Sequence, residues 1–151
     1  MWKQEFIITI TERKIIMFDL SKNNLAEQAE VGYKFNLVHP ATGEKLDAVI
    51  TVRGSQSKVV QKYSRKKFQE IEQAKTMAAR KGKEYKPSLD DLEDLAIETT
   101  SLRVIGWSGI GENGKELEFT PENVAKVLRD HPWIREQVME ESEQLSNFQP
   151  G

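Results

Sequence analysis

The chain has 151 residues, of which 30% are charged and 38% apolar, and its formal net charge is −2; this length is typical of one compact domain. The absence of cysteine excludes a thiol nucleophile, a disulfide framework and Cys-ligated metals, and two histidines are too few for a poly-histidine metal site within one chain. Because no run of about 18 apolar residues is present, we expect no membrane span and no membrane partner.

Charge is distributed unevenly along the chain. Residues 53–86 contain 11 Lys or Arg against 3 Asp or Glu, whereas residues 87–151 contain 5 against 14. The small net charge therefore hides a basic middle and an acidic end. Such segments attract each other, a partner of either sign, or another copy of the chain, and the simplest alternative is that both are solvated helix faces.

The first predicted element is a β-hairpin. Met17 begins a passage that would also serve as a protein start, so we interpret residues 1–16 as an N-terminal extension to a single domain over residues 17–148. Apolar residues alternate over residues 31–37 and again over 46–52, which is the period of half-buried strands. Pro40 and Gly43 between the two runs favour a turn. The pattern predicts an antiparallel β-hairpin over residues 31–53.

A long basic helix is predicted over residues 57–81. Ser57 provides an N-cap, and Gly82 provides a terminator. Apolar residues recur inside it at roughly helical spacing: Val60, Tyr63, Phe68, Ile71, Ala74 and Ala78. On the polar face lie four basic residues: Lys58, Lys62, Arg65 and Lys66.

Residues 88–148 are predicted to be mainly helical. Ser88 caps a helix that we expect to run to about Val104, with a buried stripe of Leu89, Leu92, Leu95, Ala96, Leu102 and Ile105. After an irregular glycine-rich stretch, Thr120 and Pro121 open a further helix, and Pro132 separates it from the last one. The chain as a whole is therefore predicted to be α+β, with an N-terminal antiparallel β-hairpin followed by about four helices.

No set of residues suggests catalysis. Residues 109–114 match the dinucleotide fingerprint G-x-G-x-x-G, but we expect them to follow a helix rather than to join a strand to a helix. His131 has no nucleophile or orienting group that the sequence identifies, and the acidic residues 90–94 do not match an EF-hand loop. We therefore expect no enzyme activity, no catalytic or metal-binding residues and no cofactor.

Three short motifs follow one another in the C-terminal half: Gly106-Trp107-Ser108-Gly109-Ile110, Phe119-Thr120-Pro121-Glu122-Asn123 and Pro132-Trp133-Ile134. In their order and spacing, the segment from Leu102 to Phe148 resembles the tail assembly chaperones of long-tailed, siphovirus-like bacteriophages. The hairpin, its exit at residues 53–57 and the basic helix are similar to members of that group through weaker motifs. Residues 1–16 lie outside the resemblance.

The resemblance implies a non-enzymatic helper in the host cytoplasm. Such a chaperone binds the tape measure protein, keeps it soluble during tail morphogenesis and is not expected in the mature virion. Members of the group are often made in two forms by a ribosomal frameshift, and the longer form recruits the tail tube protein. The resemblance supplies no established ligand residues for this chain.

A chaperone for an amphipathic helix needs an apolar surface and charges that steer the encounter. The candidate partner-binding residues are therefore Trp107, Ile110 and Trp133 for the apolar surface, and Lys62, Arg65 and Lys66 for charge complementarity. The alternative is that the three apolar residues belong to the core. Two other functions stay open: a structural tail or virion component, and a nucleic-acid-binding regulator that uses the basic helix. The opposite charges of the middle and the end also permit a homo-oligomer.

Overall fold

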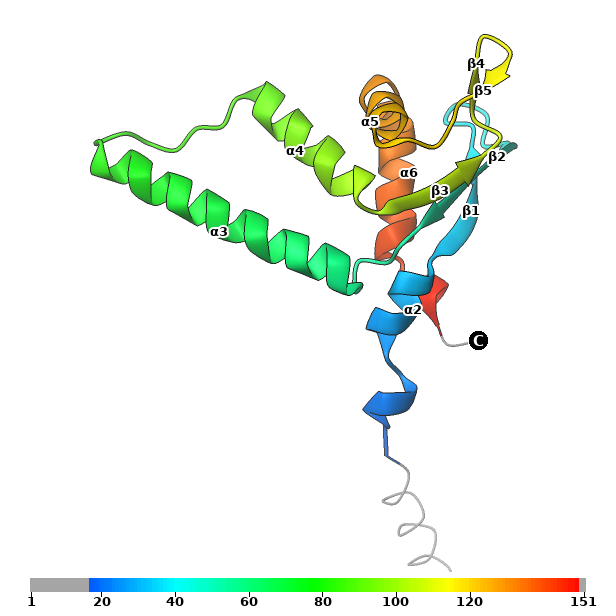
Figure 1. The fold of residues 1–151 in the computed structure, drawn as a ribbon, viewed down its shortest axis with the longest axis horizontal. Helices are drawn as coiled ribbons and strands as arrows, with labels where there is room; N and C mark the ends of the chain where they lie inside the picture. The colour runs from blue at the N-terminus through cyan, green and yellow to red at the C-terminus, as the bar shows by residue number, and fades with distance from the viewer. Residues whose placement is uncertain (1–16, 150–151) are drawn as a thin grey trace, which may run out of the picture.

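The computed structural model describes residues 17–149, so the predicted N-terminal extension lies outside the described residues. Figure 1 shows the elements, which follow one another as η1 (Leu20–Lys22), α2 (Leu25–Val31), β1 (Tyr33–Val38), β2 (Lys45–Val52), α3 (Lys58–Arg80), α4 (Leu89–Ser101), β3 (Val104–Ser108), β4 (Gly111–Glu112), β5 (Lys115–Glu116), α5 (Pro121–Asp130), α6 (Pro132–Glu143) and η2 (Leu145–Phe148). The predicted α+β class is confirmed.

The predicted hairpin is present, but its first strand begins later than expected. β1 and β2 are antiparallel, with Phe35 opposite Ile50. Val31 is instead the last residue of α2, and its side chain is 73% exposed. Gly32 ends α2 with a φ of +92°, and a Cβ there would lie 2.8 Å from Cδ1 of Ile105. A residue with a side chain would be strained at this position. Gly32 therefore allows the chain to turn from α2 directly into β1.

A third strand replaces the predicted end of the α4 helix. α4 stops at Ser101, and β3 pairs antiparallel with β2, with Trp107 opposite Ile50. The strand order is therefore β1-β2-β3. The prediction of helix to about Val104 was wrong because it assigned Ile105 to a helical stripe. Val104 and Ile105 are β-branched and thus suit a strand, and the pairing of this segment with β2 outweighs its apolar spacing.

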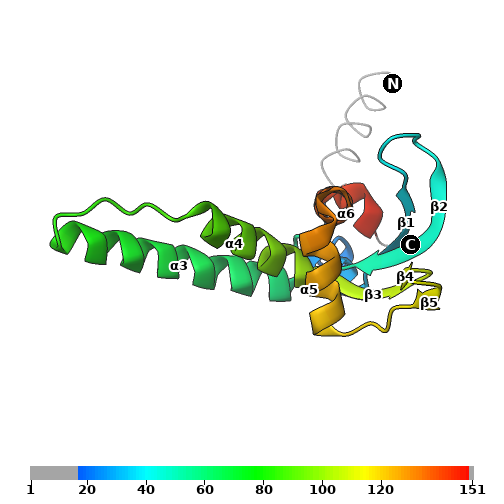
Figure 2. The same ribbon diagram turned by 90° about the horizontal axis from the view of Figure 1, so that it is seen from above.

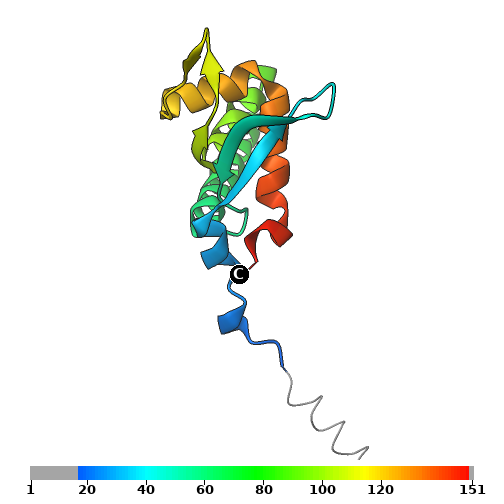
Figure 3. The same ribbon diagram turned by 90° about the vertical axis from the view of Figure 1, so that its right-hand side faces the viewer.

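Helix α6, with α5 beside it, covers one face of this sheet (Figures 2 and 3). α6 packs against β1 and β2, and α5 packs against both α4 and α6. The inward side chains of the strands meet those of the helices in one apolar cluster, formed by Phe35, Leu37, Ile50, Val52, Ile97, Val104, Ile110, Val124, Val127, Leu128, Ile134, Val138 and Phe148. Burial of this cluster is the main stabilising contribution to the fold.

Helix α3 leaves the body of the molecule as a long arm, and α4 returns along it (Figures 1 and 2). Its bounds confirm the predicted helix, since Ser57 Oγ caps it by accepting from Val60 N and Lys81 is its C-cap. Phe68 was one of the apolar residues that recur at helical spacing, but its side chain is 65% exposed. Lys67, four residues after Tyr63, takes the inward position instead and is half-buried.

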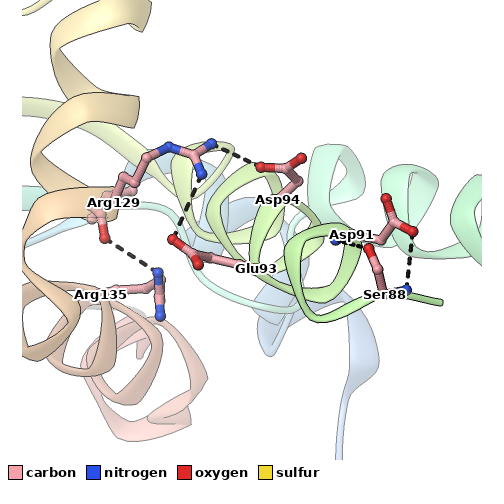
Figure 4. Close-up of polar contacts among 7 residues, drawn as sticks. Ser88, Asp91, Glu93, Asp94, Arg129 and Arg135 are labelled. Carbon is pink, nitrogen blue, oxygen red and sulfur yellow. Dashed lines mark hydrogen bonds and ion pairs between the residues drawn. The ribbon is translucent and has the colours of Figure 1, made fainter.

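Helix α4 is rotated relative to the prediction. Leu89 and Leu92 were expected inside, but they are 84% and 48% exposed, whereas Ile97 is 4% exposed. The side of α4 that carries Ile97 faces α5. Two ion pairs of Arg129 on α5 show this orientation, one with Asp94 at 2.9 Å and one with Glu93 at 3.6 Å (Figure 4). The helix start is as predicted.

That start is a complete capping box. Asp91 N donates to Ser88 Oγ at 3.0 Å, and Ser88 N donates to Asp91 Oδ2 at 3.1 Å (Figure 4). The acidic cluster at the beginning of α4 thus serves helix capping and helix packing.

Candidate partner-binding site

The glycine-rich segment after β3 forms a tight turn and a small hairpin. Gly109 has a φ of +73°, and a Cβ there would lie 3.0 Å from the carbonyl oxygen of Asp47. Asn113 and Gly114 have φ values of +54° and +78° between the paired strands β4 and β5. Two consecutive positive φ values match a type I′ hairpin turn. The G-x-G-x-x-G match therefore reflects backbone turns, with no helix beginning at its last glycine.

Trp107 is half-buried on the inner face of β3. Its indole Nε1 donates to the carbonyl oxygen of Leu117 at 3.0 Å. Its ring meets that of Phe119 edge to face, with the centroids 5.4 Å apart and an angle of 81° between the planes. The polar group of the indole is thus used inside the chain, and Trp107 holds the segment after β5 against the sheet.

Ile110 and Trp133 line one apolar pocket of about 240 Å³. Ile110 is 9% exposed and Trp133 is half-buried. The other apolar walls come from the sheet, from α5 and from α6, and they consist of Leu37, Leu46, Ala48, Leu117, Val127 and Ile134. The structure therefore brings together two of the three predicted apolar residues, while Trp107 supports the pocket through its contact with Leu117.

Polar and charged side chains form part of the pocket lining. Glu112, Lys126, Asp130 and His131 contribute to its lining, and Lys126 Nζ lies 3.0 Å from Glu112 Oε2. His131 joins α5 to α6 through its backbone, because its N–H donates to Val127 O and its carbonyl oxygen accepts from Ile134 N. Its side chain makes no capping hydrogen bond at the start of α6.

The three predicted basic residues lie on a different element from the pocket. Lys62, Arg65 and Lys66 are exposed on α3, and none of them forms an ion pair with another residue between 17 and 149. Lys67 differs, because its Nζ lies 3.2 Å from Glu70 and 3.3 Å from Glu98. The pKa of Lys67 is raised, chiefly by its hydrogen bond with Glu70. The basic and apolar parts of the predicted site are therefore separate surfaces.

A buried polar junction was not predicted from the sequence. Arg103 is 5% exposed, and its Nη1 donates to Ser142 Oγ at 3.0 Å, which in turn donates to the carbonyl oxygen of Arg53 at 2.7 Å. Burial lowers the pKa of the Arg103 guanidinium, and the nearby Glu143 carboxylate opposes this shift. The junction fastens the end of β2 to α6.

Between residues 17 and 149, no three His, Cys, Asp or Glu side chains gather as metal ligands would. Within the same range, no helix has both the length and the apolar character needed to cross a bilayer.

A family model described as YdaY prophage protein matches residues 53–151, which are 99 of the 151 residues. The chain belongs to this family. It is therefore of phage origin, which is the coarser part of what the motif resemblance implied. The matched segment includes every element from α3 to η2, and thus all six candidate partner-binding residues, whereas β1 and β2 precede it. No curated protein and no solved structure matches the chain.

Proposed function

We propose that this protein is a non-enzymatic phage tail assembly chaperone. It binds the tape measure protein in the host cytoplasm, keeps it soluble during tail morphogenesis and is absent from the mature virion. Two findings support the proposal: the chain belongs to a prophage protein family, and the motifs between Leu102 and Phe148 resemble those of tail assembly chaperones. A longer, frameshifted form would recruit the tail tube protein.

The apolar pocket beside Trp133 is the observation that carries the proposal. Its volume of about 240 Å³ suits one large apolar side chain projecting from a client helix. The charged side chains around it, including Lys126 and Asp130, would face the polar flanks of that helix. Lys62, Arg65 and Lys66 would steer the encounter with acidic parts of the client, since exposed charges act mainly on the association rate.

The test is co-expression with the tape measure protein of the same prophage. We expect the tape measure protein to become soluble and to co-purify with the wild-type chain. The variant Ala48→Phe places a ring in the pocket and should abolish co-purification, whereas Ala79→Phe on exposed α3 should not. Circular dichroism of both variants would establish that they are folded. An insoluble tape measure protein beside a well-folded wild-type chain would contradict the proposal.

Nucleic-acid binding is the second candidate, because Lys62, Arg65 and Lys66 are exposed and have no ion-pair partner in the described part of the chain. It predicts salt-sensitive binding of DNA or RNA that weakens when these residues are replaced by Glu. The same three replacements would leave the pocket of Trp133 unchanged. Binding lost only in those variants would favour the regulator over the chaperone.

A further inference from the structure

An apolar groove lies between α4 and α6, apart from the pocket of Trp133. Its volume is about 500 Å³, and its apolar lining includes Leu92, Leu95, Ala96 and Met139. Leu92 is 48% exposed, and Leu89, three residues earlier on α4, is 84% exposed. Leucines of this kind are normally buried, and among residues 17–149 no element covers them. The groove is thus an unpartnered apolar face.

Helix α6 carries two carboxylates and one guanidinium along this groove. Glu136 lines it, and Glu140 follows one turn later on the same helix. Both side chains are exposed, and neither forms an ion pair within the described part of the chain. The guanidinium of Arg135, which also lines the groove, is directed toward α5, because its Nη1 donates to the carbonyl oxygen of Leu128 at 3.3 Å (Figure 4). An occupant of the groove should therefore combine an apolar side chain with positive charge.

The arm of the same protein presents this combination. Phe68 is 65% exposed on α3. Arg65 lies three residues before it and Lys62 six residues before it, so both are within two turns of the aromatic ring. Residues 58–69 contain no acidic side chain at all. The apolar character and the charge of this surface are thus complementary to those of the groove.

We propose that Phe68 of one copy docks into the α4–α6 groove of a second copy, with Lys62 and Arg65 facing Glu136 and Glu140. The two surfaces are different parts of one chain, so the contact is heterologous and leaves a free arm at one end and a free groove at the other. Further copies can therefore add from head to tail, into an open chain or, where the rotation closes, a ring. This inference does not rest on the proposed function, because the groove is separate from the pocket of Trp133; the two proposals share only the basic residues Lys62 and Arg65.

Sedimentation equilibrium of the purified full chain, without a tape measure protein, tests the inference. We expect concentration-dependent association that weakens between about 0.1 M and about 1 M salt, because the Debye length falls from about 10 Å to about 3 Å. Phe68→Glu and Leu92→Glu should each weaken association about tenfold or more, as expected for loss of an apolar anchor. Met77→Glu is the matched control, since Met77 is 51% exposed and lies nine residues, or half a turn in rotation, from Phe68.

Mixing the two defective variants gives the sharpest result. Leu92→Glu retains the aromatic arm and Phe68→Glu retains the groove, so their equimolar mixture should form a heterodimer that grows no further. The inference is overturned if the wild-type chain stays monomeric to about 100 μM, if Met77→Glu weakens association equally, or if the folded variants do not pair. A monomeric chain whose Leu92→Glu variant fails to co-purify with the tape measure protein would assign the groove to that client instead.

Discussion

Ser142 joins two distant segments through a single hydroxyl group. It accepts from buried Arg103 and donates to the carbonyl oxygen of Arg53, and the backbone N–H of Arg53 donates to the carbonyl oxygen of Arg103 at 2.7 Å. Arg103 Nε has no partner within residues 17–149, so the guanidinium depends strongly on the hydrogen bond that it makes. Among individual residues, this junction is the clearest point at which a small change should affect the whole fold.

The variant Ser142→Ala should lower the free energy of unfolding by about 1–3 kcal/mol, because it leaves a buried donor and a buried acceptor without a partner. Urea denaturation followed by circular dichroism measures this change. Ser64→Ala on exposed α3 is the control and should change stability by no more than about 0.5 kcal/mol. Equal effects of the two substitutions would show that the junction does not contribute to stability.

At the scale of elements, the two consecutive helices α5 and α6 begin in different ways. Thr120 Oγ1 accepts from Asn123 N at 3.1 Å at the start of α5. His131, at the start of α6, makes no such bond with its side chain. Both helices have proline at an initial position, so the side-chain cap is the main local difference between them.

Thr120→Ala should therefore cost about 0.5–2 kcal/mol of stability, as is usual for loss of an N-cap. His131→Ala should cost at most about 0.5 kcal/mol, because His131 joins α5 to α6 through hydrogen bonds of its backbone alone. Thermal unfolding of the two variants compares them directly. A greater loss for His131→Ala would contradict this assignment of the caps.

The sequence predicted those elements whose ends carry strong local signals. Ser57 and Gly82 bracket α3, and Thr120 with Pro121 opens α5, because caps and prolines act within a few residues. β3 was not predicted. Its short apolar run could equally be the end of a helix, and only its pairing with β2 shows that it is a strand. The β4–β5 hairpin had a usable signal, the Asn113-Gly114 pair, which was interpreted only as irregular chain.

For the candidate site, residue types were predictable but their neighbours were not. Ile110 and Trp133 line one pocket although they are 23 positions apart and belong to different elements, and only the packing of α5 and α6 on the sheet brings them together. Spacing alone also placed Leu89 and Leu92 inside, because it does not show which side of α4 meets α5. The exposed groove therefore became visible only in the structure.

At the scale of the whole molecule, a small α+β body carries a long helical arm (Figure 1), and the molecule has several surfaces suited to partners. The pocket of Trp133, the α4–α6 groove and the basic face of α3 are distinct. An assembly chaperone uses such surfaces before particles are complete and then leaves, whereas a structural component stays in the tail. The two functions therefore predict different locations for the same chain.

Mass spectrometry of cells carrying the induced prophage is the most direct test. This chain and the tape measure protein would be quantified in the unassembled soluble fraction and in purified particles. We expect the chain to accompany the tape measure protein in the soluble fraction and to be absent, or present only in trace amounts, in the particles. A constant ratio of this chain to the tail tube protein in purified particles would contradict the chaperone proposal and identify a virion component.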